Sequence, residues 1–252
     1  MTAPALDLDR VTPTRAPVDR RASGEQKWRN LLFLHWRLPA GAVRAVVPPE
    51  LELDLWDGGA YVGVVPFEMR DIRPSWLPGA LALDFLETNL RTYVHFRGEP
   101  GVFFFSLEAS SWVAVQAARW GWGLPYHFAR MQQVARDDGS VRYVSARASD
   151  GAALLDVTYR AGTALDPPAP GSFEFFLLER YYLFAVRRGR VHKGHVHHVQ
   201  YPAHAAAIEH HACGLLAAAG MPDPGRPPDF AHFSPGVDVE VYGPWPVDGA
   251  GA

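Results

Sequence analysis

Alternating and continuous runs of apolar residues predict a chain made mainly of β-strands. Residues 51–55 alternate leucine with glutamate and aspartate, which is the period-two pattern of a half-buried strand. A glycine-containing turn at 57–59 separates this run from a second one at 60–69, so the two predict a β-hairpin. Further strands are expected over residues 28–36, 88–97, 102–108, 128–136, 140–148, 154–161, 181–187, 190–199 and 233–242.

Helices are expected to be few and short. They are predicted over residues 42–47, 112–120 and 172–178, and the alanine-rich segment 203–220 is expected to be partly helical. About ten strands in meander order indicate an α+β fold that is mainly β, either an antiparallel barrel or a sandwich, and argue against βαβ folds. The sequence contains no glycine-rich phosphate loop and no GxSxG motif, so the common nucleotide-binding and hydrolase classes are excluded.

Length and composition fit a single globular domain. Hydrophobic residues make up 48% of the 252 residues, enough for a full core. We expect a disordered leader over 1–25, one domain over 26–246 and a loose tail over 247–252. The leader lacks the apolar segment of a secretory signal, and no run approaches the roughly 18 apolar residues that span a bilayer. A cytoplasmic protein without a membrane partner is therefore predicted.

Charge and metal-ligand patterns exclude further classes. The net charge of −3 gives no basic footprint for nucleic acid. The single cysteine, Cys213, excludes an internal disulfide and fits a reducing compartment. The histidines at 192, 195, 197 and 198 follow no recognised metal spacing, so hydrogen-bonded histidines are expected there, with a metal site as the alternative. Neither a cofactor nor a metal is predicted.

Several phrases of the chain resemble the DUF2071 (YqjF-like) family. They are LLFLHWRLP (31–39), PPELELDLWDGGAYVGVVPFEM (48–69), FLETNLRTYV (85–94), GVFFFSLEAS (101–110), AARWGWGLPYHFARM (117–131), ERYYLF (179–184), VHH (196–198) and AHFSPGVDVEVY (231–242). This family belongs to the acetoacetate decarboxylase-like superfamily. The resemblance therefore implies a cone-shaped antiparallel β-barrel with a few short helices and an interior ligand cavity.

A more distant resemblance to acetoacetate decarboxylase implies site residues. The decarboxylase's substrate-side arginine matches Arg37, which precedes Pro48 by eleven residues, and its site glutamate matches Glu87. Where that enzyme carries two adjacent lysines, one of which is its Schiff-base nucleophile, this chain has Tyr126 and His127. The two lysines of the chain, at 27 and 193, lie in no matching phrase, so Schiff-base chemistry is not expected.

These matches define a candidate site. Arg37 and Arg91 are the expected substrate-binding residues, and Glu87, Tyr126 and His127 the expected catalytic ones. Positions 87, 89 and 91 share one face of a strand, whereas adjacent residues face opposite ways, so we expect Tyr126 rather than His127 to point inward. The alternatives are a structural ion pair for Arg37, a structural Glu87–Arg91 pair and a structural role for His127.

Three further charged residues belong to phrases shared with the family. Glu108, Glu179 and Arg180 are expected to form a buried ion-pair network that stabilises the barrel, with a functional role as the alternative.

Two classes of function remain open at the level of sequence. The first is a lysine-independent enzyme, decarboxylase-like or acting by proton transfer, that takes a small, anionic carboxylate or keto compound. The second is a non-catalytic module that binds or senses such a ligand. A third alternative is a subunit whose aromatic surface mediates homo-oligomerisation.

Overall fold

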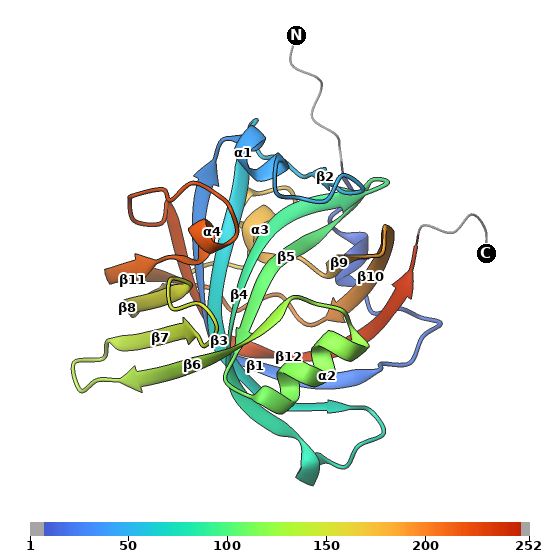
Figure 1. The fold of residues 1–252 in the computed structure, drawn as a ribbon, viewed down its shortest axis with the longest axis horizontal. Helices are drawn as coiled ribbons and strands as arrows, with labels where there is room; N and C mark the ends of the chain where they lie inside the picture. Colours follow the sequence, from blue (N-terminus) through green and yellow to red (C-terminus); the bar gives the residue numbers. More distant parts are fainter. Residues whose placement is uncertain (1–7, 248–252) are drawn as a thin grey trace.

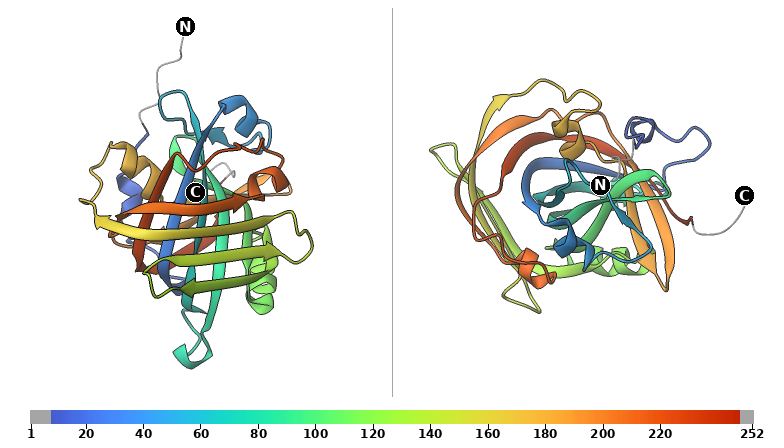
Figure 2. Two further views of the ribbon diagram at one scale, coloured as in Figure 1. Left: turned by 90° about the vertical axis from the view of Figure 1, so that its left-hand side faces the viewer. Right: turned by 90° about the horizontal axis from the view of Figure 1, so that it is seen from above.

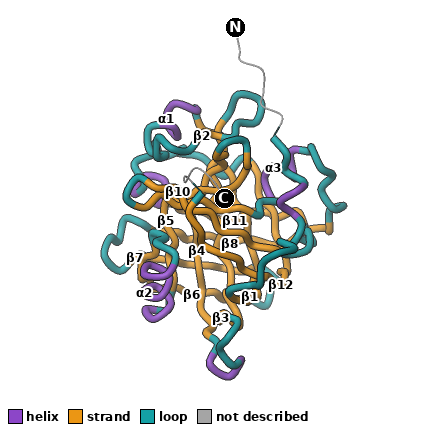
Figure 3. Tube along the Cα trace, turned by 90° about the vertical axis from the view of Figure 1, so that its right-hand side faces the viewer, coloured by secondary structure: helices purple, strands orange, loops and turns teal. Residues whose placement is uncertain are grey.

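The computed structural model describes residues 8–247, and within them the chain is built mainly of β-strands (Figures 1 and 3). The described strands are β1 (Gly24–Leu38), β2 (Glu52–Leu53), β3 (Ala60–Pro74), β4 (Leu83–Phe96), β5 (Glu99–Ala109), β6 (Tyr126–Ala135), β7 (Val141–Arg147), β8 (Leu154–Ala164), β9 (Tyr182–Arg187), β10 (Arg190–His197), β11 (His204–Cys213) and β12 (Phe230–Pro246). The helices are α1 (Ala40–Arg44), α2 (Trp112–Gly121), α3 (Phe173–Leu178) and α4 (Leu215–Ala218), with short 3-10 turns η1 (Thr12–Thr14) and η2 (Gly79–Leu81). The expectation of a mainly β, α+β fold is confirmed.

All twelve described strands belong to one sheet that closes on itself. Their order is β10-β9-β5-β6-β7-β8-β11-β12-β1-β3-β4-β2, and additional pairings join β10 to β12 and β5 to β4. Most neighbours are antiparallel, as expected, but β5 pairs in parallel with both β6 and β9. Parallel neighbours need a crossover connection, and α2 supplies it between β5 and β6. The sequence pattern therefore missed one βαβ unit.

Strands β1, β3 and β4 are covered on both faces. In Figure 2, β6, β7, β8 and β11 lie across them as a second layer. Alternate side chains of β3 enter two different cores: Val62 and Val64 pack with Leu155 and Val157 of β8 between the layers, whereas Phe67 packs on the opposite face. Because both faces of β3 are buried, its sequence reads as a continuous apolar run.

The segment 203–220 differs from its expectation. Most of it is strand β11, and only Leu215–Ala218 forms a helix. Alanine has a low β-propensity, but β11 pairs with β8 from His204 to Cys213, and these backbone hydrogen bonds outweigh the local preference. The expectation that this segment is partly helical is therefore right only for its last residues.

Part of the expected leader contacts the domain. Leu8 is buried, Arg10 forms an ion pair with Asp54, and the backbone oxygen of Pro13 lies 2.7 Å from Nε2 of His195. Residues 1–7 of the leader and 248–252 of the tail lie outside the described residues. Within residues 8–247 no helix has the length and apolar character needed to cross a bilayer.

Candidate functional site

A pocket of about 390 Å³ lies on the face of β1, β3 and β4 that points away from the second layer. Its walls are mainly apolar. They include Trp28, Leu31, Phe33, Phe67, Met69, Phe85, Phe104, Leu107, Trp122, Leu183 and Val196. Trp122 follows α2 and packs directly on Gly194 of β10, where an added Cβ would lie 2.4 Å from the indole ring. Glycine at 194 thus lets this ring form part of the wall.

The pocket has an open end and a closed, polar end. Pro74 at the end of β3, Leu83 at the start of β4 and Gly121 at the end of α2 line it and are exposed, so the mouth lies among them. Glu87 and Arg91 also line the pocket and are almost fully buried. A ligand entering from the mouth would therefore pass the apolar walls before it reached these charged groups.

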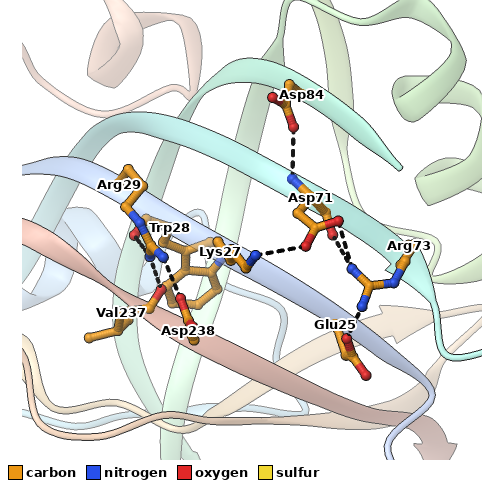
Figure 4. Close-up of polar contacts among 9 residues, drawn as sticks. All are labelled: Glu25, Lys27, Trp28, Arg29, Asp71, Arg73, Asp84, Val237 and Asp238. Carbon is orange, nitrogen blue, oxygen red and sulfur yellow. Dashed lines mark hydrogen bonds and ion pairs between the residues drawn. The ribbon is translucent and has the colours of Figure 1, made fainter. Parts of the chain in front are cut away.

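Ion pairs fasten β1 to β3 beside the mouth (Figure 4). Arg73 pairs with Asp71 and Glu25, and the Nζ of Lys27 lies 2.9 Å from Asp71. Lys27 thus lies outside the pocket, on the face of β1 opposite to that of Trp28, which lines it. The other lysine, Lys193, donates to both carboxylate oxygens of Glu99 at 2.7 and 2.8 Å.

Both lysines of the chain lie within the described residues, and neither lines the pocket. An amine nucleophile is therefore not provided by a lysine at this site.

Three polar side chains follow one another along the pocket face of β4. Glu87, Asn89 and Arg91 all line the pocket, so the expectation that they share one face is confirmed. Between them, Leu90 points into the core between the layers. Alternation along one strand thus sets a row of polar groups at the closed end.

Glu87 is a buried carboxyl bound to a tyrosine. Its Oε2 accepts a hydrogen bond from the Tyr126 hydroxyl at 2.9 Å, and the Tyr143 hydroxyl donates to its backbone oxygen at 2.8 Å. Burial raises the pKa of Glu87 to about 8, although the Tyr126 hydrogen bond lowers it. Burial likewise holds the pKa of Tyr126 well above its usual value. Near neutral pH both groups are protonated, and Glu87 is close to its titration range.

Arg91 is a buried cation without a counter-ion. The residue is 7% exposed, and its Nε and Nη2 have no hydrogen-bond partner. No carboxylate of the described residues forms an ion pair with it, whereas Arg73 and Arg180, the other arginines of the pocket, both have acidic partners. The guanidinium lies 5.6 Å from the centre of the Phe33 ring. Burial of an unpaired charge costs several kcal/mol, so Arg91 is a candidate position for binding an anion.

Among the described residues, no acidic side chain near Arg91 takes the place of that anion. Glu179 is close enough for Arg91 to lower its pKa, but burial dominates and raises it. The two oxygens of Glu179 already accept hydrogen bonds from the Tyr181 hydroxyl and from the Tyr201 amide. Asn89, next to Arg91 along the strand face, has a buried Oδ1 without a partner. The closed end thus keeps unused capacity for both ionic and hydrogen-bonded contacts.

Two of the expected site residues lie outside the pocket. Arg37 is exposed, and its Nη2 donates to the backbone oxygen of Asp57 at 2.8 Å. It lies four residues beyond Phe33 on β1, about 13 Å further along an extended strand, so the structure does not place it in this pocket.

His127 is half-buried and does not line the pocket, whereas its neighbour Tyr126 does, as the strand alternation predicts. Burial, with Arg147 and Arg119 nearby, lowers the pKa of His127 to about 4. The structure therefore brings together Glu87, Arg91 and Tyr126 and separates them from Arg37 and His127.

Glu108, Glu179 and Arg180 are buried but do not form one network. Glu108 accepts from Arg147, with Nη2 at 2.5 Å, and Arg180 donates to Asp54 at 2.7 Å. Glu179 is hydrogen-bonded rather than ion-paired. The expectation of buried ion pairs thus fits two of the three residues, each with a partner that the sequence did not indicate.

Asp54 is the partner that sequence reasoning missed. The alternating run 51–55 puts it on the polar side of a strand, yet it is buried between Arg10 and Arg180. No local signal distinguishes this aspartate from the exposed Glu52 nearby.

The histidines at 192–198 bond mainly to the backbone. His192, His195 and His198 contact the carbonyl oxygens of Arg190, Pro13 and Val199. His197 lies 3.5 Å from Glu240. No three metal-ligating side chains converge among residues 8–247.

Comparison with known proteins supports the architecture built up so far. The model of DUF2071, described as an uncharacterized conserved protein, matches residues 25–238. The chain belongs to the DUF2071 family. A relative within reach of sequence comparison is the uncharacterized protein YqjF of Bacillus subtilis (strain 168), which is 35% identical over 225 residues, covering 88% of this chain and 90% of YqjF.

Solved structures relate this DUF2071 protein to the acetoacetate decarboxylase-like fold. The enduracididine biosynthesis enzyme MppR, complexed with pyruvate, superimposes with a TM-score of 0.60 at 13% identity and covers 90% of this chain and 91% of MppR. Acetoacetate decarboxylase from Legionella pneumophila (strain Philadelphia 1) gives a TM-score of 0.59 at 15% identity over 98% of both chains. At these identities the likeness concerns the fold alone.

Proposed function

We propose that this DUF2071 protein binds a small organic carboxylate or keto acid in the interior pocket, with Arg91 as its anchor. The observation that carries the proposal is the buried guanidinium of Arg91, which lines the pocket without a counter-ion. A carboxylate there would accept charge-assisted hydrogen bonds from Nε and Nη2 in the bidentate geometry that arginine favours. That pyruvate is bound by MppR, a protein of the same fold, supports the choice of ligand class.

Glu87 and Tyr126 give this site the means to move a proton. A carboxyl with a pKa of about 8 has an accessible ionised form near neutral pH, which suits a general base. Ionised Glu87 would accept a proton from the carbon next to the carbonyl of a bound keto acid. The C–H electron pair would form the C=C bond of an enolate, and the negative charge would move to the carbonyl oxygen. Return of the proton to carbon restores both partners.

A non-catalytic binding or sensing module is the second candidate. It is favoured by a specific observation: no lysine faces the pocket, so the amine chemistry of the decarboxylase cannot be carried over. In this alternative Arg91 still anchors the carboxylate, and Glu87 only hydrogen-bonds the ligand.

Thermal denaturation with pyruvate and with acetoacetate tests the binding proposal. A ligand at 100 times its Kd stabilises the folded state by about 2.7 kcal/mol, which raises Tm by several degrees. We expect this shift in the wild type and its loss in Arg91→Met. Arg37→Ala is the matched control, because Arg37 lies outside the pocket and its loss should leave the shift intact. Equal shifts in the wild type and Arg91→Met would refute the Arg91 anchor.

Deuterium exchange into a bound keto acid separates the two candidates. If Glu87 is a base, the methyl protons of pyruvate exchange with D2O in the presence of the protein, at a rate that rises with pH through about 8. Glu87→Gln should abolish this exchange while pyruvate still shifts Tm. Binding without protein-dependent exchange would favour the non-catalytic module.

A further inference from the structure

We propose that the ligand is an amphipathic monocarboxylic acid, in which an apolar body of several carbons follows the carboxylate, rather than a three-carbon keto acid. This inference rests on the proposed function, because it assumes that Arg91 holds the carboxylate. It adds the size, the polarity and the orientation of the rest of the molecule.

The pocket is larger than a three-carbon acid requires. Its volume of about 390 Å³ lies within the range of roughly 300–1,000 Å³ that is typical of pockets for larger ligands. A water molecule occupies about 30 Å³ in the liquid, so a three-carbon acid would leave most of this space to be filled by something else. Because the walls are mainly apolar, water is a poor occupant of that space.

Polar and large apolar side chains lie at different ends of the pocket. Polar groups able to bind a head group, Arg91 and Asn89, lie at the closed end. Toward the mouth the lining includes large apolar side chains, among them Met69, Phe85 and Trp122. An acid that enters head first would place its carboxylate on Arg91 and its hydrocarbon body between these side chains.

The charged groups at the mouth are already paired with one another. Arg73 is the arginine of the pocket nearest the opening, and it is already paired with Asp71 and Glu25 (Figure 4). Arg91 is therefore the better site for the carboxylate, and the tail end of the ligand needs no second negative charge. This favours a monocarboxylate over a dicarboxylate.

A homologous series of straight-chain 2-oxo acids, from pyruvate to 2-oxooctanoate, tests the inference by calorimetric titration. Each buried methylene contributes about 0.8 kcal/mol, so we expect Kd to fall about fourfold per added carbon until the pocket is full. Primary alcohols of the same lengths, which lack the carboxylate, should bind much more weakly. Arg91→Met should weaken the acids and leave the alcohols unaffected.

A variant at the mouth tests the orientation. Ala117 of α2 lines the pocket and is exposed, so Ala117→Phe would add bulk at the open end. We expect it to weaken 2-oxooctanoate by roughly tenfold or more relative to pyruvate, reversing the gain from the longer chain. Val113→Phe is the matched control, because Val113 is exposed on the same helix and does not line the pocket. It should leave the whole series unchanged.

The outcomes distinguish this inference from the proposed function. Arg91-dependent binding of pyruvate whose affinity stays flat or falls with chain length would overturn the amphipathic ligand and keep the carboxylate site. If no acid of the series binds in an Arg91-dependent way, the proposed function itself fails. Affinity that rises with length and is reversed by Ala117→Phe supports both.

Discussion

Arg91 and Arg180 are two buried arginines that line the same pocket and differ in their partners. Arg180 is 5% exposed and donates to Asp54 and to the backbone oxygen of Phe176. Arg91 is 7% exposed, and two of its three guanidinium nitrogens lack a partner. The two arginines are thus buried to a similar extent, but only Arg180 is neutralised by a carboxylate of the described residues.

The difference separates a charge that is neutralised within the fold from one that is not. A buried ion pair holds parts of a fold together, and here Asp54 connects Arg180 to Arg10 near the N-terminal end of the described chain. An unpaired buried charge contributes nothing comparable and costs desolvation energy. The closed end of the pocket therefore holds a buried arginine that no carboxylate of the described residues neutralises.

The largest expected effect comes from breaking the paired arginine. Asp54→Asn leaves Arg180 and Arg10 without their shared carboxylate, and loss of one partner of a buried pair typically costs about 3–5 kcal/mol. Arg91→Met, in contrast, removes a charge that has no carboxylate partner among the described residues and should leave the free energy of unfolding unchanged or higher. Urea denaturation of both variants measures the contrast. Equal destabilisation would show that Arg91 is as structural as Arg180.

The second effect is a pH dependence that Glu87 imposes on stability. The folded protein keeps the Glu87 proton up to about pH 8, whereas the unfolded chain releases it near pH 4.5. Between these values the folded state binds more protons, so the free energy of unfolding falls as pH rises, by at most about 1.4 kcal/mol per pH unit. Urea denaturation from pH 5 to 8 should show a shallower decline in Glu87→Gln. Parallel curves for the two proteins would contradict the raised pKa.

A smaller effect is expected at Tyr126. Tyr126→Phe removes one buried hydrogen bond, worth about 1 kcal/mol, and also the contact that lowers the pKa of Glu87. Tyr143→Phe is the matched control, because its hydroxyl donates to the backbone oxygen of Glu87 instead of the carboxylate. Both variants should lose similar stability at pH 6, but only in Tyr126→Phe should the decline of the free energy of unfolding continue to higher pH than in the wild type, because the pKa of Glu87 rises further. A shift in both would place the cause outside the Tyr126–Glu87 bond.

The smallest effect is expected at Arg37. Its side chain is exposed and its hydrogen bond to Asp57 is on the surface, so Arg37→Ala should change the free energy of unfolding by less than about 0.5 kcal/mol. Denaturation of this variant checks the placement of Arg37 outside the site. A loss of several kcal/mol would restore the structural ion pair as its role.

Strand periodicity predicted much of this fold because most of its strands obey local rules. The hairpin joining 181–187 and 190–199 and the strands at 60–69 and 88–97 correspond to β9, β10, β3 and β4. The same alternation correctly put Glu87 and Arg91 on one face and turned Tyr126 rather than His127 inward. These are properties of neighbouring residues in one strand.

Features that depend on pairing between segments far apart in the chain could not be predicted from the sequence. The parallel partners of β5 and the strand character of β11 arise from contacts between segments far apart in the chain. The position of Arg37 outside the pocket could not be predicted either, because a spacing match does not show how far β1 runs past the end of the pocket. The lack of an ion-pair partner for Arg91 among the described residues could not be predicted either, since it becomes apparent only when the positions of all neighbouring residues are known.

The most direct test of the Arg91 anchor is a calorimetric titration of 2-oxooctanoate into the wild type, Arg91→Met and Arg37→Ala. We expect binding to the wild type and Arg37→Ala with the same Kd. For Arg91→Met we expect a Kd raised by roughly tenfold or more, because the carboxylate loses its charge-assisted hydrogen bonds. Equal binding to all three proteins would contradict an anion site at Arg91, and a loss confined to Arg37→Ala would return the site to the surface.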